Sequence, residues 1–257
     1  QRMIWYNKCA APLSVDAIRD CLNDLDGKVQ PDAITHLITV SCTGMSAPGL
    51  DLQVMELLDL PKNIYRTSVN FMGCYAAIHA LKMADVICKA EVNAKVLIVC
   101  TELCTLHFQR EATMDNIASS LLFSDGSAAV LVTGDADKNK GLQLKSFYSE
   151  VIPKGKRDMS WELSSSGFLM TLSGYIPDLI EEDFSFLVNR ALQHAGTDKE
   201  NISQWCIHPG GKRILEAIHK SLQLKNGELN ESYEVLKDYG NMSSPTILIK
   251  IKKILHH

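Results

Sequence analysis

The stretch "KVLIVCTEL", Lys95–Leu103, decides the fold class of this sequence. A nearly continuous apolar run of this length is typical of a strand that is buried on both faces of its sheet. A second run, "SAAVLVTGD" at Ser127–Asp135, has the same character. Such strands need helices on each side of the sheet, so the two runs predict a layered α/β fold.

Segments with helical and strand periodicity alternate on both sides of these two runs. The first half predicts helices at Leu13–Asp26, at Gly49–Leu60 and after Gly73, and strands at Thr35–Cys42 and Tyr65–Asn70. A polar stretch at Ala136–Gly141 predicts a seam between two halves. The second half predicts strands at Leu142–Ile152 and Gln204–His208, a serine-rich loop at Ser164–Ser166, and helices at Glu181–Gly196, Gly211–Leu224 and Leu229–Gly240. The last segment, Ser243–Leu255, fits a helix or a strand, and its Ser-Pro start favours a helix.

Composition narrows the classes of function. The chain has 257 residues, of which 46% are hydrophobic and 22% charged, with a formal net charge of -4. A nucleic-acid-binding surface would need a basic surplus, so nucleic acid is not expected as a partner. We expect no membrane segment and no signal peptide, and the eight cysteines lack metal-ligand spacing. These features predict a cytoplasmic protein with reduced thiols and no metal site.

Three residues with chemical potential lie at the ends of predicted elements, where α/β folds usually build their sites. Cys74 opens the helix in "NFMGCYAAIHALKMADVICKA", His208 ends a strand before "PGG", and Asn241 lies between two helices in "YGNMSS". Each also has a structural interpretation: a packing thiol, a hydrogen-bonded polar residue and a turn. Together they are a set suited to thioester chemistry, with a cysteine nucleophile and two hydrogen-bond donors for an oxyanion.

With these motifs the sequence resembles the type III polyketide synthases, the chalcone-synthase-like branch of the thiolase superfamily, over nearly the whole chain. The resemblance lies in "ITHLITVSCTGMSAPGLD", "FMGCYAA", "LLFSDGSAAVLV", "WCIHPGG" and "YGNMSS", and other segments look like bacterial members. It implies α-β-α-β-α layers built from two duplicated α/β halves. Residues 1–136 would carry the nucleophile, and residues 137–257 the histidine and the asparagine.

The resemblance implies catalytic roles for Cys74, His208 and Asn241. An acyl-CoA starter would acylate the cysteine, and malonyl-CoA would decarboxylate and extend it to a phenolic or pyrone product. The expected substrates are CoA thioesters, with no bound cofactor, and the expected assembly is a homodimer. The implied substrate-binding residues are Phe123, Cys42, Thr43, Cys104, His107, Trp161, Met170, Leu172, Gly210, Gly211 and Ser243.

The sequence also departs from the family's pattern. It lacks a basic segment before "QRMIWYN" and further strands after "SSPTILI", so we expect a chain truncated at both ends. Met170 stands at a second gate where plant members have phenylalanine, and Ala47 stands where they have a loop methionine. Two alternatives stay open: a β-ketoacyl synthase of the initiation type, and a truncated paralogue without activity. For Cys42 and Cys104, packing thiols are as good an interpretation as cavity-lining ones.

Overall fold

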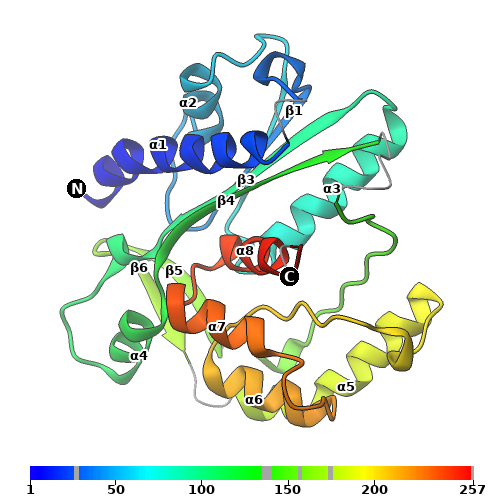
Figure 1. The fold of residues 1–257 in the computed structure, drawn as a ribbon. Coiled ribbons are helices and arrows are strands. Elements are labelled where there is room, and N and C mark those ends of the chain that lie inside the picture. The colour runs from blue at the N-terminus through cyan, green and yellow to red at the C-terminus, as the bar shows by residue number, and fades with distance from the viewer. Residues whose placement is uncertain (26–28, 135–140, 156–157, 173–175, 256–257) are drawn as a thin grey trace. The chain divides into compact units, whose positions relative to one another are not determined.

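The computed structural model describes residues 1–25, 29–134, 141–155, 158–172 and 176–255, and it is an α/β protein (Figure 1). The helices are α1 (Arg2–Asn23), α2 (Leu50–Leu57), α3 (Ala76–Ala90), α4 (Met114–Leu122), α5 (Ile176–Ala195), α6 (Lys212–Ser221), α7 (Asn230–Tyr239) and α8 (Ser244–Leu255). The strands are β1 (His36–Ser41), β2 (Tyr65–Asn70), β3 (Lys95–Leu103), β4 (Asp125–Thr133), β5 (Met159–Ser164) and β6 (Gly167–Leu172). Short 3-10 turns lie at Pro31–Ala33, Cys104–His107, Pro153–Gly155 and Lys199–Asn201.

The described residues divide into two compact units, each of which is described here by itself. Unit 1 contains residues 1–107, 124–143 and 242–249, and unit 2 contains residues 108–123, 144–241 and 250–257. The division predicted after residue 136 falls in residues 135–140, outside the described part of the chain, and it stays a prediction.

A four-stranded sheet with the order β2-β1-β3-β4 forms the centre of unit 1. β1 is parallel to both β2 and β3, and β4 is antiparallel to β3. Helix α1 lies along one face of the sheet and α3 along the other (Figure 1). Leu97 and Val99 of β3 belong to the core cluster that includes Ile18 of α1. The predicted strand Lys95–Leu103 is confirmed, and its apolar run follows from helices on both of its faces.

The first helix is longer than predicted. It begins at Arg2 rather than Leu13 and contains Pro12 in its interior. A proline normally opens a helix, because it has no N–H to donate to the preceding turn. Here Pro12 lies on the exposed side, while Tyr6, Ala10 and Ala11 are buried against the sheet. Burial of that apolar face stabilises the turns before the proline in spite of the lost hydrogen bond.

Two strands predicted for the second half are wrong. Leu142–Ile152 and Gln204–His208 belong to no strand of the described structure, although the residue types in both segments are typical of strands. A strand needs a neighbour for its backbone hydrogen bonds, and apolar periodicity cannot supply one. Within the predicted loop Ser164–Ser166, Ser164 ends β5, and the next two serines form the turn of a hairpin in which β5 and β6 pair antiparallel. The later predicted helices are confirmed as α5, α6, α7 and α8, with shifted ends.

Candidate active site

Cys74 lies in the turn between β2 and α3, two residues before the first helical residue, Ala76. The chain reverses sharply here, because Phe71 and Gly73 have positive φ values of 55° and 76°. Glycine adopts that conformation without strain, whereas a side chain at position 73 would be strained. The predicted position at the helix start is therefore correct to within one turn. The thiol is half-buried and stands just ahead of the positive end of the α3 dipole.

Two other thiols of unit 1 are close to Cys74. The Cys42 Sγ accepts a hydrogen bond from the Gly73 N–H at 3.3 Å, and both Cys42 and Cys104 interact electrostatically with Cys74. Burial raises the pKa of Cys42 to about 12 and raises the pKa of Cys104 well above its ordinary value. Because the thiolate is the nucleophile, these two cysteines stay protonated and unreactive at neutral pH. Their part in a cavity wall stays a prediction.

Glu102 is a buried carboxylate beside Cys42 that the sequence analysis missed. It is fully buried near the end of β3 and makes no ion pair with any described residue. One carboxylate oxygen, Oε2, accepts hydrogen bonds from the Cys42 N–H at 2.8 Å and the Thr43 hydroxyl at 2.8 Å. The other, Oε1, accepts one from the Ser244 hydroxyl at 2.9 Å. Burial outweighs these donors and raises the pKa of Glu102 to about 7. The available signal was a single carboxylate inside the apolar run Lys95–Leu103.

Thr43 and His107 are tied to the same network. The Thr43 hydroxyl donates to Glu102 and accepts from the Leu103 N–H at 2.8 Å. The His107 Nε2 lies 2.6 Å from the Thr43 carbonyl oxygen, which can only accept, so this nitrogen carries the proton. Burial lowers the pKa of His107, and its imidazole is therefore neutral at neutral pH. Ser243 is buried with a positive φ of 61°, in the turn just before α8.

The two ring nitrogens of His208, in unit 2, are shielded from solvent, although the residue as a whole is half-buried. Neither of its ring nitrogens has a partner among the described residues, and burial alone lowers its pKa to about 4. Buried polar atoms are nearly always hydrogen-bonded in folded proteins, because an unsatisfied one costs about 1–3 kcal/mol. A histidine kept in this condition is a candidate for a group whose partner is a substrate or a reacting atom.

Asn241 is fully buried directly after α7, where Gly240 has a positive φ of 72°. Its backbone N–H donates to the Leu122 carbonyl at 2.9 Å, and the chain forms a parallel bridge with Phe123 there. The Asn241 Nδ2 donates to the Gly210 carbonyl at 3.3 Å. Asn241, Phe123 and Gly210 are therefore together in unit 2.

The two glycines after His208 allow a tight turn into α6. The Gly210 N–H donates to the His208 carbonyl at 2.9 Å. A Cβ atom at position 210 would lie 3.2 Å from Ile214 Cδ1, which is tight, and 3.6 Å from His208 Cδ2, which is an ordinary contact with the histidine ring. Gly211 is the residue that precedes α6.

The predicted pocket residues Trp161, Met170 and Leu172 share one face of the β5–β6 hairpin. Trp161 is directly opposite Met170, and Leu172 is two residues further along β6. Trp161 also packs edge-on against Phe168, with ring centroids 5.8 Å apart. Helix α4, which ends one residue before Phe123, contacts β6. The three residues therefore form one apolar surface, and their contact with substrate stays a prediction.

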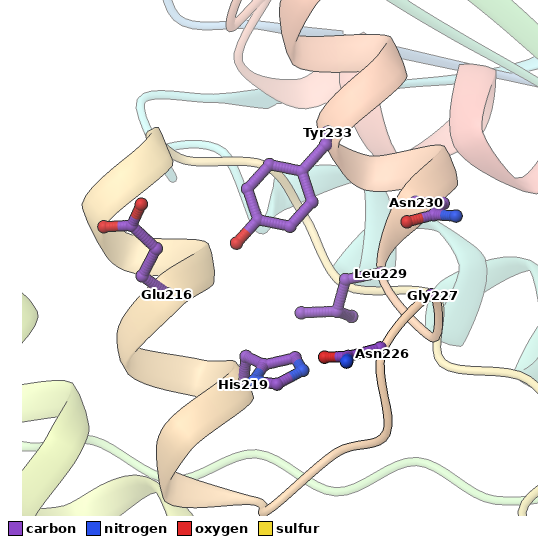
Figure 2. A pocket seen from close by; sticks show the side chains of 7 residues that line it. All are labelled: Glu216, His219, Asn226, Gly227, Leu229, Asn230 and Tyr233. Carbon is purple, nitrogen blue, oxygen red and sulfur yellow. The ribbon is translucent and has the colours of Figure 1, made fainter.

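A separate hollow of about 430 Å³ lies between α6 and α7 (Figure 2). Glu216 and His219 of α6 and Tyr233 of α7 line it, and none of the predicted site residues does.

Within the described residues there is no group of three or more potential metal ligands. None of the helices described here is long and apolar enough to cross a membrane.

Both halves of the chain match domains of one known protein family. Residues 2–136 match the N-terminal domain of the chalcone and stilbene synthases, and residues 143–257 match the C-terminal domain of the same family. The chain is 32% identical to a putative chalcone synthase of Bacillus subtilis, over 94% of this chain and 69% of that protein. It is 30% identical to probable polyketide synthase 1 of Dictyostelium discoideum, over 95% of this chain and only 8% of that protein.

A solved structure is similar along the whole chain. The crystal structure of the C-terminal type III polyketide synthase domain of Steely1, a type I/III hybrid from Dictyostelium, superimposes with a TM-score of 0.90 at 28% identity. The match covers 100% of this chain and 72% of that domain. The α/β fold class that was predicted from the apolar strands, and its thiolase-like type, are thereby confirmed.

Proposed function

The chain belongs to the chalcone and stilbene synthase family, the type III polyketide synthases, and from this premise we propose that it extends a cysteine-bound acyl group with malonyl-CoA. The observation that carries the proposal is the imidazole of His208, whose buried ring nitrogens have no hydrogen-bond partner among the described residues. The amide of Asn241 is held near it through the Gly210 carbonyl. Two such donors suit an oxyanion that forms only during the reaction.

In the first step, the Cys74 thiolate attacks the thioester carbonyl of an acyl-CoA. The new C–S bond joins the acyl group to Cys74, and the bond to CoA breaks, so that CoA leaves as a thiol after taking up a proton. The half-buried position of Cys74 before α3 allows access and favours the negative charge. The protonated thiols of Cys42 and Cys104 cannot compete for the acyl group at neutral pH.

In the second step, malonyl-CoA loses CO2, and the electron pair of the broken C–C bond becomes the enolate of acetyl-CoA. His208 and Asn241 donate hydrogen bonds to the enolate oxygen. The enolate carbon then attacks the Cys74 thioester, which forms a C–C bond and expels the Cys74 thiolate. Repetition lengthens the chain by two carbons each time, and cyclisation gives a phenolic or pyrone product.

The environment of His208 constrains how it acts in this scheme. Burial alone would keep the ring neutral, since its pKa lies near 4. An imidazolium at neutral pH therefore requires a compensating anion, and in the proposal that anion is the Cys74 thiolate. The thioester and the release of CO2 supply the driving force, so the proposed reaction uses CoA thioesters and no bound cofactor. We also propose a homodimer as the working assembly.

The first prediction tests the nucleophile. The purified chain is incubated with isotopically labelled malonyl-CoA and a panel of acyl-CoA starters, and its peptides and products are identified by mass spectrometry. We expect the acyl group on the Cys74 peptide, cyclised products in solution, and neither with Cys74→Ala. The matched control Cys9→Ala, which removes an exposed thiol of α1, should behave like the unaltered chain. Acylation of Cys42 or Cys104, or none at all, would contradict the proposal.

A further inference from the structure

The backbone of the segment that ends at His208 is hydrogen-bonded by side chains rather than by a neighbouring strand. Residues 202–209 are not part of any strand in the described structure. Backbone carbonyls in a buried setting need donors, and here a neighbouring strand does not provide them. In an extended chain the carbonyls of residues i and i+2 point to the same side, so those of Trp205 and Ile207 need donors on one side of the segment.

Two side chains provide these donors. The Lys250 Nζ of α8 donates to the Trp205 carbonyl at 2.7 Å and to the Ser232 hydroxyl at 2.6 Å. The Ser232 hydroxyl of α7 donates in turn to the Ile207 carbonyl at 2.8 Å, one residue before His208. Lys250 and Ser232 are both fully buried. The chain of bonds therefore connects α7 and α8 to the backbone immediately before the histidine.

Packing alone does not explain a lysine at this position. Its neighbours Ile247, Leu248 and Ile249 are apolar, and no ion pair of Lys250 is found among the described residues, although Glu231 interacts with it electrostatically. Burial lowers the pKa of Lys250, which means that the folded protein bears a cost for its charge. An apolar side chain of similar volume would avoid that desolvation cost. The two directed hydrogen bonds are what an apolar residue could not supply.

We propose that Lys250 and Ser232 are positioning residues for His208, and that together they take the place of a strand neighbour along the segment that ends at the imidazole. The catalytic meaning of this inference rests on the proposed function. Without these bonds the Trp205 and Ile207 carbonyls lose their donors, and the segment must shift to find others. A shift of about 1 Å in a catalytic group can reduce a rate by a factor on the order of 10².

The second prediction is tested first by the NMR chemical shift of the His208 ring, a measurement that does not depend on activity. The protein is labelled with ¹³C-histidine, and the His208 ring signal is assigned from its loss in His208→Gln. We expect Lys250→Met and Ser232→Ala to move this signal at one neutral pH, and the double variant to move it no further than the larger single shift. Lys253→Met removes a lysine that bonds Glu234 at the surface of the same helix, and it should leave the signal in place.

Thermal unfolding separates positioning from a purely structural role. We expect Lys250→Met to stay folded, because the relief of the lysine's desolvation opposes the loss of its two hydrogen bonds, and we expect its His208 signal to move all the same. If Lys250→Met does not fold, Ser232→Ala, which removes only a hydroxyl, carries the test. A folded variant with an unmoved His208 signal would overturn the inference, whatever its stability.

The rate of CO2 release from labelled malonyl-CoA then shows whether the position of His208 affects decarboxylation. We expect Lys250→Met and Ser232→Ala to slow it about 10- to 100-fold, with acylation of Cys74 by a starter less affected. If the unaltered chain releases no CO2, the proposed function fails while the His208 signal still decides the positioning. If the signal moves and the CO2 release does not change, the positioning has no catalytic consequence and the inference is wrong.

Discussion

At the scale of single residues, motifs point to the three proposed catalytic residues, whereas the two buried charged residues, Glu102 and Lys250, lie in no motif. Cys74, His208 and Asn241 each stand where glycines break an element, and those breaks are visible in the sequence. Glu102 is one charge in a strand, and Lys250 is one of three lysines in "IKIKK", where a solvent-exposed stripe is the ordinary expectation. Their burial results from tertiary packing, which periodicity within one element does not encode.

The third prediction concerns the pH dependence of stability and follows from Glu102. Its pKa is about 7 in the folded protein, against an ordinary value of 4.5. Between these values the folded state binds more protons than the unfolded state, so the free energy of unfolding falls as pH rises from about 4.5 to 7 and then levels off. The total contribution is about 3 kcal/mol.

Glu102→Gln tests this directly, because glutamine keeps an acceptor and resembles the protonated acid. Ser244 can accept from the new amide as readily as it donates to the carboxylate. We expect the variant to match the unaltered chain in acid and to be more stable above neutral pH, measured by urea unfolding across the pH range. Glu56→Gln, at an exposed position on α2, should have no such effect. Equal pH profiles for the Glu102 variant and the unaltered chain would contradict the assignment.

At the scale of elements, periodicity predicted helices and buried strands well and failed where a partner decides the structure. β3 was predicted with its bounds, because its apolar run reflects burial on both faces. Gln204–His208 has the same strand-like composition, but its carbonyls are bonded by side chains. The hairpin β5–β6 was missed because its turn, Ser165 and Ser166, resembles a loop, and because Leu169 interrupts the polar and apolar alternation of β6.

The fourth prediction belongs to this hairpin. Trp161→Ala removes the largest side chain from its apolar face and should let the enzyme accept longer acyl-CoA starters or add extension rounds. The lost contact with Phe168 should also lower stability, by less than the ~3–5 kcal/mol of a fully buried aromatic, since Trp161 is half-buried.

Product profiles by mass spectrometry give the measurement for this variant. Trp5→Ala serves as control, because that tryptophan is exposed on α1 and should change neither the starter range nor the products. An unchanged profile in a folded Trp161→Ala protein would mean that the indole only anchors the hairpin.

At the scale of the whole molecule, the residues of the proposed reaction come from distant parts of the chain. Cys74 belongs to unit 1, and His208 and Asn241 belong to unit 2. Periodicity within elements gives no reason for three such residues to act together. The proposed function gives such a reason for a chain that matches the family over residues 2–136 and 143–257. Under that proposal the removal of His208 should change the ionisation of Cys74, which can be measured.

The last prediction divides the roles of His208 and Asn241. His208 should assist both ionisation of Cys74 and stabilisation of the enolate, whereas Asn241, an uncharged donor, should assist only the enolate. Asn241→Ala should slow CO2 release from malonyl-CoA on the order of 10²–10³-fold and leave the pH profile of Cys74 alkylation by iodoacetamide unchanged. His208→Ala should slow CO2 release and also move the alkylation profile to higher pH, because the cation that stabilises the thiolate is gone. Asn201→Ala, at an exposed position of the same unit, should alter neither measurement. An alkylation profile that shifts as far in Asn241→Ala as in His208→Ala would contradict this division of roles, and a profile that shifts in neither variant would mean that the turn before α3, rather than an imidazolium, stabilises the thiolate.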